Sequence, residues 1–376
     1  MATARAVAAF TAILVCLNIS PVVAEPIQVH LFEAHPDLSR VIVKGPFAII
    51  SPVQLSFSRG TYEIIAAGSG RLEIRSGSST VLSAARARVT APGPAGLYLE
   101  AHGSPHHYKG NVVFSCHKDG ARNTLIVTNT VERRDYVEST VGSETQPGWP
   151  IECLKAIAVL AQTRLARLKS SEELGDSTQR QAYFGADYAR PEVRKAVTAV
   201  WGRELRYHGE PIEAFFHSTC AGGTSDGVNV FGDAAKGLVY LRGVECSYCK
   251  DSPFWKETVT RIPISSFATV FGDKSPHVDG MDRCQRPLFI NYELPVGSTH
   301  HFSGYQFWTK LGQRFGWDKA PGLRFKMTRR GDDIVVTSTG AGHGVGLCDW
   351  GAAGQAKLGK KYDEILYYYF PGTKVQ

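Results

Sequence analysis

One stretch of the chain combines a histidine, a cysteine and an aspartate with many glycines. Residues 342–356 read GHGVGLCDWGAAGQA. Glycines on both sides of His343 indicate positive φ angles or a close backbone approach that other residues would not allow. The small residues after Trp350 fit the start of a tightly packed helix. A loop that leads into such a helix would place His343 at a surface, so this stretch is not ordinary core.

The N-terminus has the order of a secretory signal. Arg5 precedes an apolar run over Ala6–Val15, and Val22–Ala24 comes just before the first acidic residue. We therefore expect residues 1–24 to be a signal peptide and the mature protein to be exported, to the periplasm or the cell envelope. A lipoprotein signal at Cys16 ranks second, because a valine precedes it where a small residue is needed. No other apolar stretch approaches the roughly twenty residues that span a bilayer, so we expect no transmembrane segment in the mature chain.

The charge balance bears on the partner. The chain has 42 Lys and Arg against 35 Asp and Glu, a formal net charge of +7 over 376 residues. The excess is spread out, and no basic run is interleaved with aromatics, so we do not expect nucleic acid as a partner. An acidic polymer at a cell surface is the better candidate. The 43% of hydrophobic and 20% of charged residues fit one or two sizeable folded cores.

The periodicity of apolar residues predicts an α+β fold. Over residues 25–130, short apolar runs alternate with Gly, Ser and Pro turns, which predicts strands in a meandering sheet. The pattern changes in the region 131–376. There Pro150 opens a predicted helix with one buried stripe, and helices are also expected over Pro191–Trp201 and from Asp363, as the cap, to Phe370. We therefore expect a strand-rich N-terminal region and a mixed α/β catalytic region with a substrate cleft.

The cysteines offer a second lead. The chain has eight, of which Cys16 would leave with the signal, so at least one thiol is free, metal-bound or paired between chains. Cys246 and Cys249 form a C-x-x-C pair, and His217 and Cys220 form an H-x-x-C pair. Together these could supply three thiolates and one imidazole to a closed tetrahedral zinc site. A disulfide between two of the cysteines is the alternative, which an exported location favours.

Three blocks of sequence agree with one family pattern. The first contains VGSE, ending at Glu144, and continues through Trp149-Pro150 to QTR, ending at Arg164. The second reads FHSTCAGGT over residues 216–224, and the third is the opening stretch, continued to Pro371-Gly372-Thr373. In these blocks the chain resembles the stage II sporulation protein D family, also called the amidase-enhancer family, whose best-described members are peptidoglycan lytic transglycosylases. The resemblance covers about residues 130 to 376 and fits the strand-rich portion only loosely.

The resemblance implies that Glu144 is the catalytic acid. Ordinary glycosidases need a second carboxylate, whereas in a lytic transglycosylase the 6-hydroxyl of the muramic acid attacks the anomeric carbon. One residue can then protonate the leaving oxygen and take the hydroxyl proton, provided that burial raises its pKa towards neutrality. The product has a 1,6-anhydro end, and the chemistry requires no cofactor. The local sequence alone indicates a solvated glutamate before a helix, whose dipole would lower its pKa.

The resemblance also implies further site residues. It places His343 in the same cleft, where the histidine could orient the sugar, stabilise charge or assist proton transfer; a structural histidine bonded to loop carbonyls is the alternative. The expected substrate-binding residues are Lys155, Gln162, Arg164, His217, Ser218 and Asp349. Of these, the first three would act if the polar face of the helix after Pro150 lines the groove.

The chain departs from the family pattern in one place. Many relatives carry Met-Ser-Gln where this chain has Leu347-Cys348-Asp349. Asp349 could act as a second acid/base group or cap the following helix. Some family members bind zinc through His and Cys near the second block, so the resemblance favours a zinc site of His217, Cys220, Cys246 and Cys249. That zinc would be structural, because four protein ligands leave no open position.

We therefore expect an exported enzyme that cleaves peptidoglycan glycan strands, stripped of stem peptides as in relatives, with a cell-wall amidase as a candidate partner. Two other classes of function remain. A cysteine or zinc peptidase could use Cys348 beside His343, although the usual third orienting residue is not evident. A non-catalytic glycan-binding module could instead activate an N-acetylmuramoyl-L-alanine amidase, as the family's older name implies.

Overall fold

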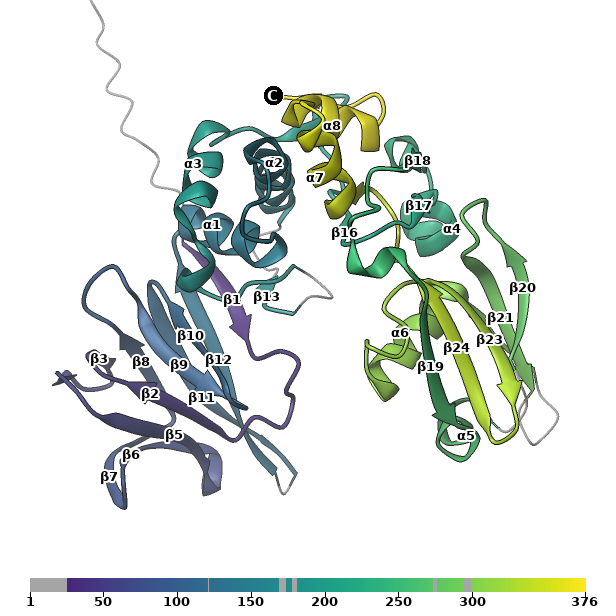
Figure 1. Cartoon of the computed structure of the whole chain (residues 1–376). Coiled ribbons are helices and arrows are strands. Elements are labelled where there is room, and N and C mark those ends of the chain that lie inside the picture. Colours follow the sequence, from purple (N-terminus) through teal and green to yellow (C-terminus); the bar gives the residue numbers. More distant parts are fainter. Residues whose placement is uncertain (1–25, 121, 169–173, 178–180, 273–275, 294–298) are drawn as a thin grey trace, which may run out of the picture.

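The computed structural model describes residues 26–120, 122–168, 174–177, 181–272, 276–293 and 299–376. The predicted signal peptide, residues 1–24, lies outside the described residues. Helices and several separate sheets confirm the predicted α+β class. Figure 1 shows two strand-rich lobes with a group of helices between and above them. None of the helices within the described ranges is long and apolar enough to cross a membrane.

The first lobe, residues 27–131 with the two-residue strand β13 added at one edge, consists of two packed sheets. One has the strand order β13-β1-β12-β11-β8-β3-β4, and the other has the order β10-β9-β2-β5-β6-β7. Alternate residues of β12, such as Leu125 and Val127, are buried, and strands of the two sheets contact each other across this core. The strands are β1 (Ile27–Leu31), β2 (Arg40–Lys44), β3 (Phe47–Ser51), β4 (Leu55–Phe57), β5 (Thr61–Ala67), β6 (Arg71–Ser76), β7 (Ser79–Ala84), β8 (Arg86–Thr90), β9 (Leu97–Ala101), β10 (Ser104–Tyr108), β11 (Asn111–Asp119), β12 (Arg122–Val131) and β13 (Leu174–Gly175).

The helical group surrounds α2, the helix predicted after Pro150. This helix, Ile151–Arg167, contacts α1 (Arg133–Glu144), α3 (Pro191–Ala199), α7 (Asp349–Lys357) and α8 (Tyr362–Tyr369). Contacts on so many sides explain why α2 is apolar beyond one stripe. The expected cap of α8 is wrong, because the helix begins at Tyr362 and the Glu364 carboxylate accepts the backbone N–H of Lys361 at 2.7 Å.

Helix α1 was not predicted from the sequence. Its buried residues include polar ones, among them Glu138, Ser139 and Thr140, so no apolar stripe marks it. Gly142 is needed near its end, because a Cβ there would lie 1.8 Å from the carbonyl oxygen of Tyr188.

The second lobe, residues 258–339, lies between the second and third sequence blocks. It contains two three-stranded sheets, β19-β24-β23 and β20-β21-β22, and two helices. Phe267 and Phe271 of α5 pack with Phe307 of α6 in its core. Its elements are β19 (Thr258–Pro263), α5 (Ile264–Phe271), β20 (His277–Met281), β21 (Pro287–Glu293), β22 (Thr299–Ser303), α6 (Gly304–Phe315), β23 (Arg324–Arg330) and β24 (Asp333–Thr339).

Short strands join the helical group to the second lobe. In the parallel pair of β16 (Phe216–His217) and β25 (Leu347–Cys348), His217 lies opposite Cys348, so the second and third sequence blocks meet. The remaining short elements are β14 (Leu205–Tyr207), β15 (Glu210–Pro211), β17 (Gly222–Gly223), α4 (Gly227–Phe231), β18 (Glu245–Cys246), β26 (Lys374–Val375) and the 3₁₀ turns Gly68–Gly70, Ala186–Tyr188, Gly232–Ala235, Val239–Leu241 and Pro253–Trp255.

Candidate functional site

A cavity of about 670 Å³ lies where the helical group, β16 and the second lobe meet. The sequence-predicted residues that line it are Glu144, His217, Ser218, His343 and Asp349. They come from all three sequence blocks: the end of α1, strand β16, and the loop and helix around β25. The fold therefore brings together, in one cavity, residues that are far apart in the sequence.

Glu144 is the last residue of α1 and is half-buried at the cavity. Its Oε1 accepts a hydrogen bond from the backbone N–H of Ala182 at 2.6 Å. Burial raises the pKa of Glu144 to about 7, against the opposing effects of the Ala182 N–H and the positive charge of Arg164. The expected location before a helix is wrong: Glu144 ends a helix, where the dipole disfavours a negative charge. Glu144 can therefore gain or lose a proton near neutral pH.

Polar contacts fix the end of α1. The Ser143 hydroxyl accepts the backbone N–H of Phe184 at 3.1 Å. The Arg190 guanidinium donates to the carbonyl oxygens of Gly142 and Thr145, each at 3.1 Å. These bonds satisfy carbonyls that the end of a helix leaves without partners, and they hold Glu144 in place.

Asp349 supplies a second carboxyl group to the cavity. It is the first residue of α7 and is only 4% exposed, and its Oδ1 has no hydrogen-bond partner among the described residues. Burial, with the nearby Glu144 charge, raises the pKa of Asp349 well above its usual value. The helix cap is Cys348, whose Sγ accepts the Gly351 N–H at 3.3 Å. Asp349 is therefore not the cap, and it can exchange hydrogen bonds with a ligand.

His343 lines the cavity, but backbone groups occupy both of its ring nitrogens. Nδ1 accepts the N–H of Val345 at 3.1 Å, and Nε2 donates to the carbonyl oxygen of Phe216 at 3.0 Å. Burial lowers the pKa of His343 to about 4, so the ring is neutral. The flanking Gly342 and Gly344 have φ angles of +91° and +82°. These are the contacts of a structural histidine, and they leave no nitrogen for proton transfer.

His217 offers a free nitrogen instead. It is 4% exposed, and its Nδ1 donates to the carbonyl oxygen of Val345 at 3.2 Å, which leaves Nε2 as an acceptor. Nε2 has no partner among the described residues. Burial and the neighbouring His343 lower the pKa of His217 well below its usual value, so the ring is neutral. Ser218 lies beside it, with its hydroxyl 3.3 Å from the hydroxyl of Thr219.

Three predicted substrate-binding residues on α2 are not among the described residues that line the cavity. Lys155 pairs with the Glu152 carboxylate at 2.7 Å. The Gln162 side chain is buried and bonds the Val200 carbonyl at 3.0 Å and the Gly202 N–H at 2.7 Å. Arg164 is half-buried and acts on Glu144 through its charge. The expectation that this face of α2 lines the groove is therefore corrected, because it packs against neighbouring chain segments.

Aromatic side chains that the sequence did not predict form one wall of the cavity. In the second lobe, helix α6 and the loop that follows it contribute Tyr305, Trp308 and Trp317 to the cavity, and Trp149 and Trp350 stand on the helical side. The Trp308 and Trp317 rings lie 5.0 Å apart, and the Trp308 indole N–H donates to the Ala320 carbonyl at 2.7 Å. No motif marks these residues; the clustering of tryptophans in one segment is the only sequence signal. Aromatic walls with a few polar groups are typical of ligand sites.

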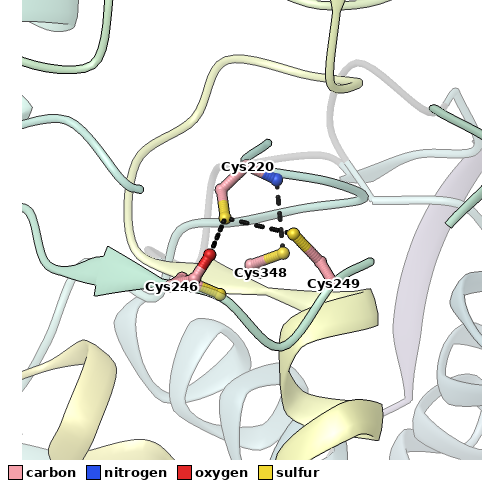
Figure 2. Close-up of side chains that lie close together, drawn as sticks. All are labelled: Cys220, Cys246, Cys249 and Cys348. Carbon is pink, nitrogen blue, oxygen red and sulfur yellow. Dashed lines mark hydrogen bonds between the residues drawn. The ribbon is translucent and has the colours of Figure 1, made fainter. Parts of the chain in front are cut away.

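The cysteine cluster lies behind the cavity wall. The Sγ atoms of Cys220, Cys246, Cys249 and Cys348 all lie within 4.8 Å of one another (Figure 2). The expected fourth member, His217, is replaced by Cys348, because the β16–β25 pairing brings Cys348 into the group while His217 Nδ1 faces Val345. None of the seven cysteines in the described ranges forms a disulfide. Buried in this cluster, Cys348 does not form a nucleophile pair with His343, whose nitrogens bind backbone.

Comparisons with known proteins agree on one family. The sequence model of the stage II sporulation protein family matches residues 121–207. The chain is 32% identical over 264 residues to stage II sporulation protein D of Bacillus subtilis. The matched region covers 64% of this chain and 73% of that protein. An uncharacterized protein of Brachyspira hyodysenteriae is 30% identical over 275 residues, 71% of this chain and 72% of its own. The amidase enhancer of Bacillus subtilis is 23% identical over 288 residues, 63% of this chain and 40% of its own.

Proposed function

Because the chain belongs to the stage II sporulation protein D family, we propose that it is an exported lytic transglycosylase that cleaves the glycan strands of peptidoglycan. The observation that carries this proposal is the raised pKa of the Glu144 carboxyl group. Its carboxyl group faces the cavity with a pKa of about 7, the range in which one group can both give and accept a proton.

The reaction needs two proton transfers, and Glu144 takes part in both. Protonated Glu144 gives its proton to the glycosidic oxygen as the bond from the anomeric carbon to that oxygen breaks. The 6-hydroxyl oxygen of the same muramic acid then bonds to the anomeric carbon, and its proton passes to the Glu144 carboxylate. No water is consumed, and the product carries a 1,6-anhydro end. The Ala182 N–H holds Oε1 at 2.6 Å, which leaves Oε2 for the substrate.

The other polar groups of the cavity would bind the sugars. Oδ1 of Asp349 and Nε2 of His217 are buried atoms without partners among the described residues, and such atoms are costly until a ligand pairs with them. A neutral Asp349 can donate to a sugar oxygen, while Nε2 of His217 accepts from a hydroxyl or an N-acetyl N–H. Trp308 and Trp317 offer an apolar wall for the less polar parts of the sugar rings.

The finer points of the proposal rest on the family. The preference for strands without stem peptides, the envelope location and an amidase partner come from the resemblance and from the name of the relative called amidase enhancer. That name also favours a second candidate function, in which the protein binds glycan without cleaving it and activates a separate N-acetylmuramoyl-L-alanine amidase.

A matched pair of variants separates the two functions. Glu144→Gln keeps an acceptor for the Ala182 N–H but cannot supply the proton, and Glu210→Gln makes the same change at the exposed start of β15. With denuded glycan strands, the native mature chain (residues 25–376) and Glu210→Gln should release anhydro-ended fragments, and Glu144→Gln should bind strands but release none. Full cleavage by Glu144→Gln would refute the role of Glu144. Binding without cleavage by all three would leave the activator function.

A further inference from the structure

Four cysteines from three separate segments meet at one buried point. Cys220 follows β16, Cys246 ends β18 with Cys249 in the turn after it, and Cys348 ends β25 (Figure 2). All four are at most 1% exposed. Packing of small apolar side chains alone does not explain why three separate segments place all of their cysteines at one point. No two of these cysteines form a disulfide in the structure.

The spacing of the sulfur atoms fits a tetrahedral metal. Metal–sulfur bonds of about 2.3 Å in a tetrahedron place the sulfurs about 3.8 Å apart. The Cys220 and Cys249 Sγ atoms are 3.5 Å apart, and all six Sγ–Sγ separations fall within 4.8 Å. A disulfide requires about 2.05 Å and would engage the sulfurs only in pairs. The arrangement is therefore that of a four-ligand site.

Hydrogen-bond donors point at the sulfurs. The backbone N–H groups of Cys220 and Gly351 each donate to Cys348 Sγ at 3.3 Å, and the Tyr369 hydroxyl lies 3.2 Å from Cys246 Sγ. Donors of this kind stabilise thiolates and are typical around metal-bound cysteines. Gly351 is also sterically required, because a Cβ there would lie 2.8 Å from Cys246 Sγ. The shell around the cluster is thus built for charged sulfur.

A buried cation lies beside the cluster. Arg286 is 2% exposed, and its guanidinium donates to the carbonyl oxygens of Cys220 (2.8 Å) and Gly223 (3.1 Å) and to the Ser225 hydroxyl (3.0 Å). These acceptors are neutral, and no carboxylate in the described part of the chain forms an ion pair with this guanidinium. The buried Asp282 carboxylate is linked to this guanidinium through the Ser225 hydroxyl, which hydrogen-bonds Asp282 Oδ2. Four thiolates around a divalent cation carry a net charge of −2, and the positive charge of Arg286 beside them would offset part of it.

We propose that Cys220, Cys246, Cys249 and Cys348 bind one zinc ion in a closed tetrathiolate site. Binding converts the four thiols to thiolates and releases their protons, with no change of oxidation state. With four protein ligands the ion has no open position, so its role is structural. The site ties the segment after β16 and the Cys246–Cys249 turn to the start of α7, and Ser218 and Asp349 of the cavity lie within two residues of its ligands.

Metal content tests this site without any reference to glycan cleavage. The mature chain, purified from zinc-supplemented medium and desalted, should contain about one zinc ion per chain by elemental mass spectrometry. Cys249→Ser and Cys348→Ser should lose the zinc. The control Cys116→Ser, in β11 outside the cluster, should keep it. Less than about 0.1 zinc per chain in the native protein, or about one iron instead, would overturn the assignment.

Two measurements on the native chain test the site without variants, which could lose zinc because they fail to fold. Cobalt(II) exchanged into the site should give the thiolate-to-metal absorption of a tetrahedral four-sulfur centre. Alkylation followed by peptide mass spectrometry should leave the four cluster cysteines unmodified until a strong chelator is added. A Cys220–Cys249 disulfide in peptides prepared without reductant, or four cysteines that alkylate equally with and without chelator, would refute the metal site.

Discussion

The carboxyl groups of Glu144 and Asp349 line the same cavity from the end of one helix and the start of another. Burial raises the pKa of both, that of Glu144 to about 7 and that of Asp349 well above its usual value, where the charge of Glu144 adds to the effect. At neutral pH the two groups therefore hold more protons than two exposed carboxyls would. The proposed transfer of a proton to a glycosidic oxygen requires a carboxyl group that is protonated near neutral pH.

Stability should depend on pH through Glu144. Its pKa rises from 4.5 when exposed to about 7 in the folded chain, so the folded state binds the proton more tightly. The free energy of unfolding should therefore fall as the pH rises from about 4.5 to about 7, by no more than about 3 kcal/mol. In Glu144→Gln this part of the dependence should vanish. Urea denaturation of both proteins at pH 5 and pH 7.5 measures it; equal slopes with pH would contradict the raised pKa.

Cleavage should follow the protonated form of Glu144. Above about pH 7 the acid loses its proton, so kcat/KM should fall about tenfold per pH unit. Besides burial, which raises the pKa of Glu144, the Ala182 N–H and the Arg164 charge lower it, and the Glu144 charge in turn raises the pKa of Asp349. His217 and His343 remain neutral in this range. A pH series with denuded strands gives the profile. A rate that climbs steadily to pH 9 would show that a base with a higher pKa controls the reaction.

How much of this could be read from the sequence depends on where each signal lies. Helix α2 was predicted because its apolar residues recur with helical spacing, whereas α1 carries buried Ser139 and Thr140 and gives no such signal. The H-x-x-C spacing pointed to His217 as a metal ligand. The residue that takes this position, Cys348, is brought in by a parallel strand pair that no local pattern encodes.

The residues that line the cavity could also be predicted from the sequence only in part. The three blocks located Glu144, because its surroundings resemble the family pattern, and drew attention to Asp349, because it departs from that pattern. Trp308 and Trp317 belong to the second lobe, which lies between two blocks, and no motif there distinguishes a cavity residue from a core residue. Lys155 and Gln162 were predicted to bind substrate but do not line the cavity. Polar residues on a helix look alike in sequence whether they face a cleft or bond to neighbouring chain segments.

Replacement of His343 should affect folding more than chemistry. In His343→Ala the Phe216 carbonyl and the Val345 N–H lose their partners, which should lower the free energy of unfolding by about 1 to 3 kcal/mol per unsatisfied group. The pH profile of the remaining activity should keep its fall near pH 7, because Glu144 sets it. A profile that loses or moves this step by more than about one pH unit would assign proton transfer to His343 instead.

Gln162 should likewise behave as a structural residue. Gln162→Ala removes the bonds to the Val200 carbonyl and the Gly202 N–H inside the helical group, so the free energy of unfolding should fall by about 1 to 3 kcal/mol. At a temperature where the variant stays folded, KM for glycan strands should match that of the native chain. Lys155→Ala, which breaks the pair with Glu152, should leave KM unchanged too. A severalfold rise in KM in either variant would place α2 in the binding groove.

The most direct test of the central claim is mass spectrometry of the products formed from denuded glycan strands in water enriched in oxygen-18. Intramolecular attack by the 6-hydroxyl predicts fragments with 1,6-anhydro ends and no label. Labelled reducing ends would contradict this, and would show that water attacks instead, with Asp349 as the second carboxyl group of a hydrolase. Intact strands would contradict the enzyme claim altogether.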